Sequence, residues 1–216
     1  MATYDLEEQE QISELKTWWR MYGNIVVAAS LVVIIGVAGW QFWGRYQRSQ
    51  AEQATVIYAA VQKAAAAHDA KKAREAAGEL LEKFPGTTYA AMAALMSARL
   101  QFDAGDLASA KTQLQWVVDK ASDTGLRDLA RLRLAHVLFD DKAPDEALKL
   151  LEIPSDPAFV PRYAELKGDI LATQAKKPEA RAAYQAALAK LDALKAPREA
   201  NYRELLQMKL DALGEK

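Results

Sequence analysis

The pattern of apolar and polar residues divides the chain into two parts. Between Ile25 and Trp43, all 19 residues are apolar except Ser30 and Gln41, and none is charged. From about residue 51 onward, apolar residues recur three or four positions apart, which is the spacing of amphipathic helices. Alternation typical of β-strands is almost absent. The sequence therefore predicts an all-α protein with one long apolar helix near its N-terminus.

The apolar segment has the length of a membrane-spanning helix. At 1.5 Å per residue it rises roughly 28 Å, close to the roughly 30 Å hydrocarbon core of a bilayer. Aromatic residues at both edges of such a segment are typical of the membrane interfaces. Here they are Trp18, Trp19 and Tyr22 before it, and Trp40, Phe42, Trp43 and Tyr46 at its end. We predict a transmembrane helix over residues 23–44.

The residues before this helix argue against a cleaved signal peptide. A secretory signal begins with a basic segment and ends at a site of small residues. Residues 1–22 instead carry five acidic residues and two basic ones, Lys16 and Arg20. We expect an acidic tail over residues 1–22 and an anchor that stays in place. Arg45 and Arg48 balance the two basic residues of the tail, so charge alone leaves the orientation in the membrane open.

Small residues in the apolar segment suggest a helix-packing face. Ala29, Gly36 and Gly39 lie near one stripe of the predicted helix, where a second membrane helix could come close. Membrane helices are also generally rich in glycine and alanine, which explains the same residues without a partner. Both interpretations stay open.

A repeat runs through the second part of the chain. Each copy has a small residue, another small residue 12 positions later and a large apolar residue four further on. The copies are Ala98, Ala110 and Leu114; Ala135, Ala147 and Leu151; Gly168, Ala180 and Tyr184; and, more loosely, Ala65, Ala77 and Leu81. A period of 33 to 37 residues is typical of stacked helical hairpins. The small residues would let the two helices approach, and the large residue would fill the space beyond.

These hairpins resemble the tetratricopeptide repeat, a 34-residue helix–turn–helix unit. The stretch "DAGDLASA" carries the typical turn and the alanine that follows it, at Gly105, Asp106 and Ala110. The copies are degenerate, because the aromatic residue expected early in the first helix is missing. We predict a helical connection over residues 45–57, a tetratricopeptide-like solenoid over 58–195 and a capping helix over 196–216.

Charge and composition exclude some functions. From Ala51 onward the chain has 24 Lys and Arg residues and 24 Asp and Glu residues, so this part has no net charge. A nucleic-acid-binding domain needs a basic face, and we expect no nucleic-acid partner. The chain has no cysteine, which rules out disulfides and thiolate metal sites.

No arrangement of residues typical of catalysis is found. His68 and His136 are the only histidines, one in a predicted turn and the other in a predicted helix. Phosphate-binding loops and zinc-protease motifs are absent. The acidic pairs Asp140–Asp141 and Asp145–Glu146 stand at a turn and a helix start, where they favour capping. We expect a protein that is not an enzyme and that holds no cofactor or metal.

The inner face of the predicted solenoid is the candidate for partner binding. If the repeat register holds, eight residues face the concave side, and several are large and apolar. They are Met92, Leu95, Arg99, Phe102, Leu129, Leu132, His136 and Phe139. An exposed groove of this kind would bind a helix or an unfolded segment. The alternative is that these residues pack against neighbouring repeats.

The whole layout resembles a known family. The tail "YDLEEQEQISELKTWWRMYGN", the single membrane helix and the alanine-rich repeats are similar to the YfgM-type ancillary subunit of the bacterial Sec translocon. The resemblance implies a single-pass protein of the inner membrane, with its N-terminus in the cytoplasm and its repeats in the periplasm. It also implies contacts with the translocon channel subunits, with a membrane-anchored periplasmic chaperone of the prolyl-isomerase type and with emerging secretory proteins.

The leading hypothesis is therefore a non-enzymatic, membrane-anchored adaptor of the Sec translocon. A tetratricopeptide-like scaffold of another cell-envelope assembly complex would have the same sequence features. Only the identity of the partners separates these two hypotheses.

Overall fold

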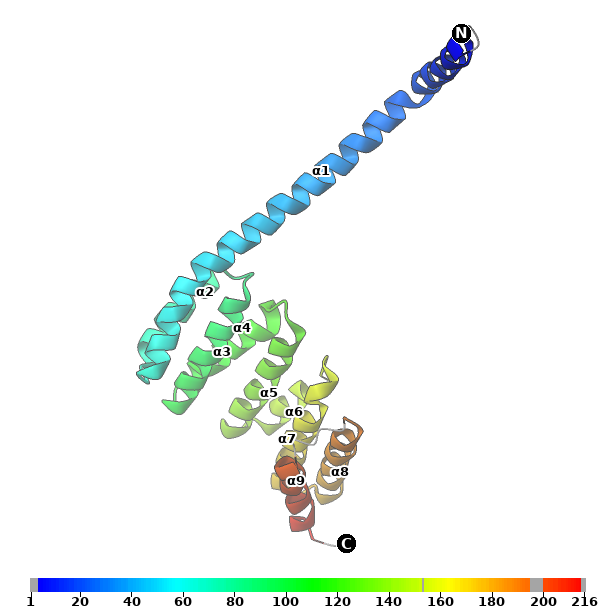
Figure 1. Ribbon diagram of the computed structural model, residues 1–216. Coiled ribbons are helices and arrows are strands. Elements are labelled where there is room, and N and C mark those ends of the chain that lie inside the picture. Colours follow the sequence, from blue (N-terminus) through cyan, green and yellow to red (C-terminus); the bar gives the residue numbers. More distant parts are fainter. Residues whose placement is uncertain (1–3, 153, 195–199, 215–216) are drawn as a thin grey trace. The chain divides into compact units, whose positions relative to one another are not determined.

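The computed structural model describes residues 4–152, 154–194 and 200–214, with side chains from residue 11 onward. Every element in this part of the chain is helical, which confirms the all-α prediction (Figure 1). The elements are α1 Tyr4–Ala66, α2 Ala70–Lys83, α3 Thr88–Asp103, α4 Leu107–Lys120, α5 Thr124–Asp140, α6 Pro144–Leu150, the 3₁₀ turn η1 Pro157–Phe159, α7 Val160–Thr173, α8 Lys177–Ala193 and α9 Ala200–Ala212. The chain forms two compact units, residues 1–49 and 50–216.

The first unit consists of the N-terminal part of α1. Among the described residues, one helical stretch, Gln11–Ala66, is long and apolar enough to cross a membrane, and its most apolar window has a mean hydropathy of 2.2. None of that window is buried within the chain. Ala29, Gly36 and Gly39 are exposed, and a Cβ atom added at Gly36 or Gly39 would meet nothing within 4 Å. The surface at these three residues is therefore open to a neighbouring helix. The helix-packing face stays a prediction, because the described residues contain no second membrane helix.

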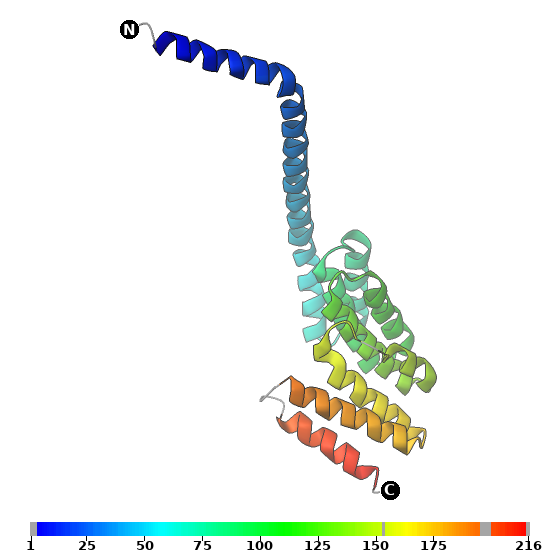
Figure 2. The same ribbon diagram turned by 90° about the vertical axis from the view of Figure 1, so that its right-hand side faces the viewer.

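The second unit is a series of helical hairpins that share one turn conformation. Figures 1 and 2 show its helices following one another as antiparallel neighbours. Each of four hairpins turns at a residue with positive φ: His68 (52°), Gly105 (80°), Lys142 (63°) and Ala175 (58°). The left-handed conformation costs energy in a residue with a side chain. Three of the four turns therefore form without the glycine that would favour them.

These turn residues fix the register of the repeat. Residues Ala98, Ala135 and Gly168 each stand seven positions before a turn residue, as the predicted repeat requires. In the first hairpin the equivalent position is Val61. The predicted first copy, which starts at Ala65, is therefore wrong by four residues, or about one helical turn.

Burial supports the corrected register of the first hairpin. Val61, Ala73 and Ala77 are completely buried, whereas Ala65 and Leu81 are only partly buried. The alanine run over residues 64–67 provides small residues at several neighbouring positions. Small residues alone therefore do not distinguish the correct register from one displaced by a turn.

Side-chain caps and prolines begin the helices of the stack. The carboxylates of Asp69, Asp106 and Asp123 accept backbone N–H bonds from the residues three positions later, at 2.8–3.0 Å. Such caps satisfy donors of the first helical turn. Pro144 and Pro178 stand in the first turns of α6 and α8, where proline loses no helical hydrogen bond. Of the predicted cap over residues 196–216, residues 196–199 and 215–216 lie outside the described residues, and α9 forms most of the rest.

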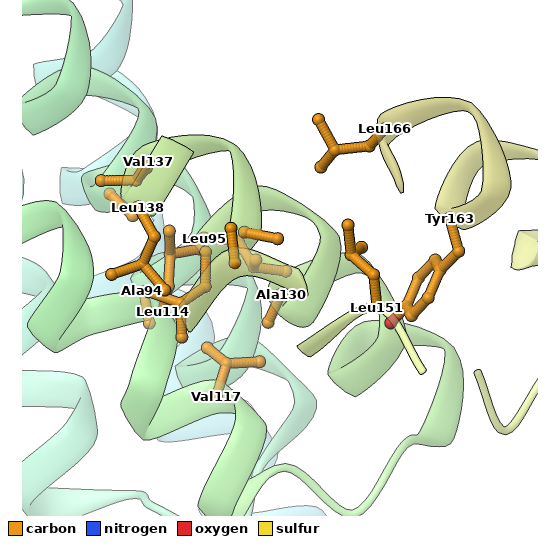
Figure 3. Close-up of a cluster of buried hydrophobic side chains, with 14 of the residues drawn as sticks. Ala94, Leu95, Leu114, Val117, Ala130, Val137, Leu138, Leu151, Tyr163 and Leu166 are labelled. Carbon is orange, nitrogen blue, oxygen red and sulfur yellow. The ribbon is translucent and has the colours of Figure 1, made fainter. Parts of the chain in front are cut away.

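A continuous apolar core runs through the stack from α3 to α7. Alanine allows close packing where the two helices of a hairpin face each other, and Ala110, Ala147 and Ala180 are completely buried. Larger side chains fill the spaces between hairpins, including Leu114, Leu151 and Leu166 (Figure 3). All nine residues of the three predicted small–small–large copies are buried, as packing between the helices requires.

The closest helix approach occurs at Gly168 in α7. A Cβ atom at this position would lie 2.5 Å from Cε1 of Tyr184 in α8, a distance at which atoms clash. The ring cannot easily turn away, because the Tyr184 hydroxyl donates a 2.8 Å hydrogen bond to Oδ1 of Asp169. Gly168 is therefore required by packing.

A buried carboxylate fastens the segment between α6 and α7. Asp128 of α5 is completely buried, and its carboxylate accepts bonds from the Asp156 backbone N–H at 2.7 Å and from Arg131 at 2.9 Å. The Tyr163 hydroxyl donates to the backbone carbonyl of Asp128 at 2.9 Å. Burial, with the nearby charge of Asp128, raises the pKa of Tyr163 to about 12. Asp128 thus connects α5 to the segment that follows α6 and to α7.

Candidate functional site

The eight residues predicted to face the concave side lie on two helices. Met92, Leu95, Arg99 and Phe102 belong to α3, and Leu129, Leu132, His136 and Phe139 belong to α5. These helices are the first helices of successive hairpins.

The eight residues differ strongly in exposure. Met92 is 38% exposed, but Leu95 is only 5% exposed and belongs to the core. Phe102, Leu129, Leu132 and Phe139 are partly buried and pack against that core. The alternative interpretation, packing against neighbouring elements, therefore holds for Leu95. It also holds in part for the other four residues, whose side chains are partly covered. A partner-binding role for the set stays a prediction.

A pocket of about 260 Å³ lies between α3 and α5. Three of the predicted residues line it: Arg99, Phe102 and His136. Its other lining residues are Ala98, Leu114, Arg133, Val137 and Asp140. The structure therefore brings together three of the eight predicted residues, two of them polar, and it adds a second arginine, Arg133, that the sequence analysis did not select.

The two arginines of the pocket have different surroundings. Nε of Arg99 pairs with Oδ2 of Asp103, one turn later in α3, at 2.8 Å. Nη1 of Arg133 donates a long 3.4 Å hydrogen bond to the backbone carbonyl of Leu95. Within the described residues, Arg133 forms no ion pair. Burial, together with the positive charge of Arg99, holds the pKa of Arg133 below its usual value.

His136 contributes a neutral ring to the pocket. Burial lowers the pKa of its imidazole, and the positive charge of Lys209 lowers it further. The carboxylates of Asp140, Asp169 and Glu165 act in the opposite direction without reversing the shift. A histidine with a lowered pKa is uncharged at neutral pH and offers one hydrogen-bond donor and one acceptor. In the described part of the chain, no cluster of side chains could hold a metal ion.

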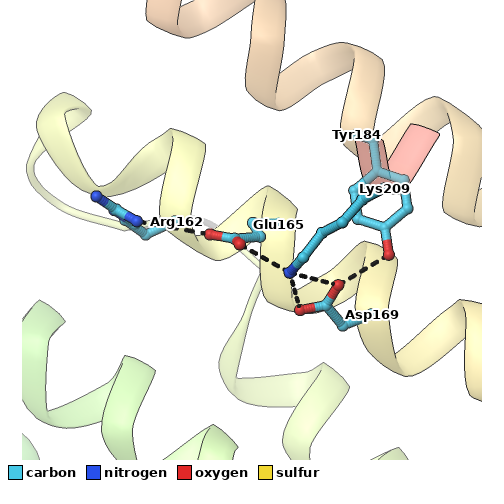
Figure 4. A network of polar contacts seen from close by, with 5 residues as sticks. All are labelled: Arg162, Glu165, Asp169, Tyr184 and Lys209. Atoms are coloured by element: carbon cyan, nitrogen blue, oxygen red, sulfur yellow. Dashed lines mark hydrogen bonds and ion pairs between the residues drawn. The ribbon is translucent and has the colours of Figure 1, made fainter. Parts of the chain in front are cut away.

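The C-terminal end of the stack holds a network of paired charges (Figure 4). Nζ of Lys209 in α9 lies 2.7 Å from Oε1 of Glu165 and 2.7 Å from Oδ2 of Asp169, both in α7. Burial lowers the pKa of Lys209, but the two carboxylates outweigh this effect, and the pKa is raised. Asp169 also accepts the hydrogen bond from Tyr184 of α8. The network thereby joins the last three helices.

A second contact reinforces the attachment of α9. The guanidinium of Arg162 in α7 lies 3.4 Å from the centre of the Tyr202 ring in α9, in cation–π geometry. Arg162 also pairs with Glu165 at 3.7 Å. The charges of the C-terminal network are therefore paired within the chain, whereas the pocket is lined by an arginine, Arg133, that forms no ion pair with any described residue.

Sequence reasoning missed the two cations that distinguish these regions, Arg133 and Lys209. Arg133 stands one helical turn before His136 in the stretch "RLRLAH", so their common face could have been recognised. Lys209 meets carboxylates 40 and 44 positions earlier in the chain. No local pattern indicates that pairing.

Comparisons with known proteins agree with this architecture. A family model described as "Tetratricopeptide repeat-like domain" matches residues 16–215. No solved structure gives a significant match.

Three similar curated proteins all carry the description "Ancillary SecYEG translocon subunit". The one from Neisseria gonorrhoeae is 34% identical, with 96% of this chain and 98% of the relative covered. The one from Haemophilus influenzae is 29% identical, with 85% of this chain and 90% of the relative covered. The one from Escherichia coli is 28% identical, with 99% of this chain and 100% of the relative covered. The repeats and these near full-length matches show that the chain belongs to the tetratricopeptide-repeat-like family of ancillary SecYEG translocon subunits.

Proposed function

We propose that this protein is a non-enzymatic accessory subunit of the Sec translocon, held in the bacterial inner membrane by the apolar part of α1. The observation that carries this proposal is the 34% identity to a protein named as an ancillary translocon subunit, over 96% of the chain. The match includes the anchor as well as the repeats. The description of neither the family model nor the relatives names an enzymatic activity.

The proposed topology assigns a separate role to each part of the chain. Residues 1–22 form a cytoplasmic tail, 23–44 cross the membrane and 45–57 connect to the repeats. Residues 58–195 and the cap over 196–216 lie in the periplasm. Exposure of the apolar residues of α1 supports the anchor, and the exposed Ala29, Gly36 and Gly39 offer a close-packing face to a channel helix.

The repeats are the proposed site of contact with soluble partners. These partners are a membrane-anchored periplasmic chaperone of the prolyl-isomerase type and secretory chains that emerge from the channel. Support comes from the α3–α5 face, where Met92 is exposed and a pocket opens beside Phe102. Stacked helical repeats characteristically bind partners along such faces.

A pull-down with an exchanged anchor tests the assembly. The full-length protein and a version with residues 1–50 replaced by an unrelated anchor are purified in mild detergent and analysed by mass spectrometry. We expect channel subunits and a periplasmic chaperone with the native protein, and the chaperone alone with the exchanged anchor. Recovery of a different envelope complex, with neither expected partner, would contradict the proposal and favour the scaffold hypothesis.

The absence of cysteine allows a clean test of topology. Single variants Ser13→Cys in the tail and Ser122→Cys between α4 and α5 are exposed to a membrane-impermeant maleimide in whole cells with a permeable outer membrane. We expect labelling at position 122 and none at position 13 until the inner membrane is opened. The reverse pattern would invert the proposed orientation.

A further inference from the structure

The pocket between α3 and α5 contains an arginine that has no counter-ion within the described residues. Arg133 makes one long hydrogen bond, to the Leu95 carbonyl, and the carboxylate of Asp140, although it lines the same pocket, forms no ion pair with it. A guanidinium does not lose its proton under physiological conditions, so the charge stays. Arg133 is exposed, so its charge, which has no ion pair among the described residues, is available to an anion that enters the pocket.

The charges around Arg133 favour an arriving anion. Arg99 lies on the facing helix and pairs with Asp103 through Nε. Its positive charge acts on Arg133 and disfavours the charge there. The imidazole of His136 is neutral at neutral pH and provides hydrogen-bonding capacity without another charge. A carboxylate placed between the two arginines would therefore relieve a repulsion as well as form new bonds.

The size and apolar walls of the pocket restrict what can enter. Its volume of about 260 Å³ lies below the roughly 300–1,000 Å³ of most small-molecule sites. One or two side chains fit this space. Phe102, Leu114 and Val137 give it apolar walls beside the arginines. The space suits a carboxylate side chain together with an adjacent apolar one.

We propose that this pocket binds an acidic segment of a partner protein by enclosing an Asp or Glu side chain between Arg99 and Arg133 and a neighbouring apolar side chain against Phe102. The inference rests on the proposed function as an adaptor and specifies the chemistry of its partner. The planar guanidinium of Arg133 presents two parallel N–H donors to a carboxylate, which gives the contact directional specificity. Recognition of acidic motifs by clustered arginines is a recurring mode of peptide binding.

A peptide array tests this chemistry directly. Full-length protein in mild detergent is applied to short overlapping peptides from the periplasmic segments of channel subunits and from periplasmic chaperones. We expect the retained peptides to carry Asp or Glu beside a large apolar residue. Retention without an acidic preference, or no retention of any peptide, would overturn the proposal.

Variants of the arginine and of the peptide locate the contact. The best-retained peptide is made again with its acidic residue changed to the amide, and its affinity is measured by fluorescence anisotropy. Arg133→Gln and the amide peptide should each weaken binding about tenfold, and together they should weaken it little further. Arg133→Lys keeps the charge but not the paired donors, so we expect an intermediate affinity. Full additivity of the two changes would show that these groups do not meet.

A matched control and a fold check separate binding from stability. Arg74→Gln removes a surface ion pair with Asp106 and an arginine that does not line the pocket, so its affinity should equal that of the wild type. Circular dichroism verifies the helical content of each variant. If the Arg74 and Arg133 variants bind equally well, the pocket is not the site.

The outcome can be separated from that of the proposed function. Peptide affinity is measured without the translocon, whereas the exchanged-anchor experiment measures assembly with it. If no acidic peptide binds but the channel subunits still co-purify, the pocket proposal is wrong and the accessory role stands. Acidic-peptide binding without co-purification would retain the pocket and contradict the translocon assignment.

Discussion

The C-terminal network and the α3–α5 pocket use their cations in opposite ways. In the network, Lys209 lies within 2.7 Å of two carboxylates and joins α9 to α7. In the pocket, Arg133 has a long bond to a carbonyl and no ion pair among the described residues. Both regions are built from the same kind of hairpin. The difference indicates that one end of the stack is closed by its own charges, while the middle is left able to receive a charge from outside.

The largest loss of stability is expected where a paired charge is completely buried. Asp128→Ala removes the acceptor of both the Asp156 N–H and Arg131, and it leaves a donor and a cation without their partner. We expect the free energy of unfolding to fall by about 3 kcal/mol. Urea unfolding in detergent, followed by circular dichroism, measures it. Asp140→Ala, at an exposed position of the same helix, should change it by less than about 0.5 kcal/mol, and equal losses would refute the role of Asp128.

A somewhat smaller loss is expected from overpacking beside the network. Gly168→Ala places a methyl group against the Tyr184 ring, whose hydroxyl is fixed by Asp169. We expect a loss of about 2 kcal/mol in the same unfolding measurement. Gly78→Ala in α2 is the control, because a Cβ atom there meets nothing within 4 Å. It should gain up to about 1 kcal/mol from helix propensity. If the free energy of unfolding rises in both variants, the Tyr184 ring does not restrict the side chain at position 168.

Removal of the network cation should loosen α9. Lys209→Met leaves Glu165 and Asp169 without their shared partner, with an expected cost of about 1–2 kcal/mol. Faster amide hydrogen exchange in α9 of the Lys209→Met variant would show that this helix is held less firmly. Lys83→Met, which removes an exposed pair with Glu79, should cost no more than about 0.5 kcal/mol. Unchanged exchange in α9 would mean that Lys209 does not hold this helix.

The same pairing predicts a dependence on alkaline pH. Because folding raises the pKa of Lys209, its contribution to stability is fully present below the unfolded value of about 10.4. It is lost as the pH rises through the higher pKa of the folded state. The stability of Lys209→Met should therefore decline less than that of the wild type above about pH 10.

The smallest effect is expected at the pocket, and it tests the comparison most directly. Arg133→Met replaces an exposed guanidinium, which forms no ion pair with any described residue, by an apolar side chain of similar length. We expect the free energy of unfolding to change by less than about 0.5 kcal/mol, since no ion pair is lost. A loss as large as that of Lys209→Met would show that the two cations do not differ.

The sequence predicts the fold better than it predicts the charges. The small–small–large spacing indicates three hairpins correctly, because helix packing requires small residues at fixed positions in the chain. It predicts that Gly168 and Ala180 let two helices approach and that Tyr184 fills the space beyond, whereas in the structure the Tyr184 ring lies against Gly168 itself. In the first hairpin the same signal is ambiguous, because several adjacent alanines satisfy it equally well.

The paired charges could not be predicted, for a physical reason. Asp128 is an acidic residue near the start of a helix, where capping or solvent exposure is the usual interpretation. Its burial depends on the connection that returns over it 28 residues later. Of the predicted concave residues, Leu95 lies in the core because α3 is covered on more than one side. Repeat spacing specifies which residues share a face, but it does not specify how deeply each one lies.

The short helix α6 has a mechanical consequence for the stack. It has seven residues, half the length of α4, so the third hairpin has little of a second helix to brace its neighbour. The joint that follows α6 is held by the apolar core and also by Asp128, which binds the connecting segment to α5. Resistance to bending at this joint is therefore expected to come from one buried carboxylate together with the apolar core that continues into α7.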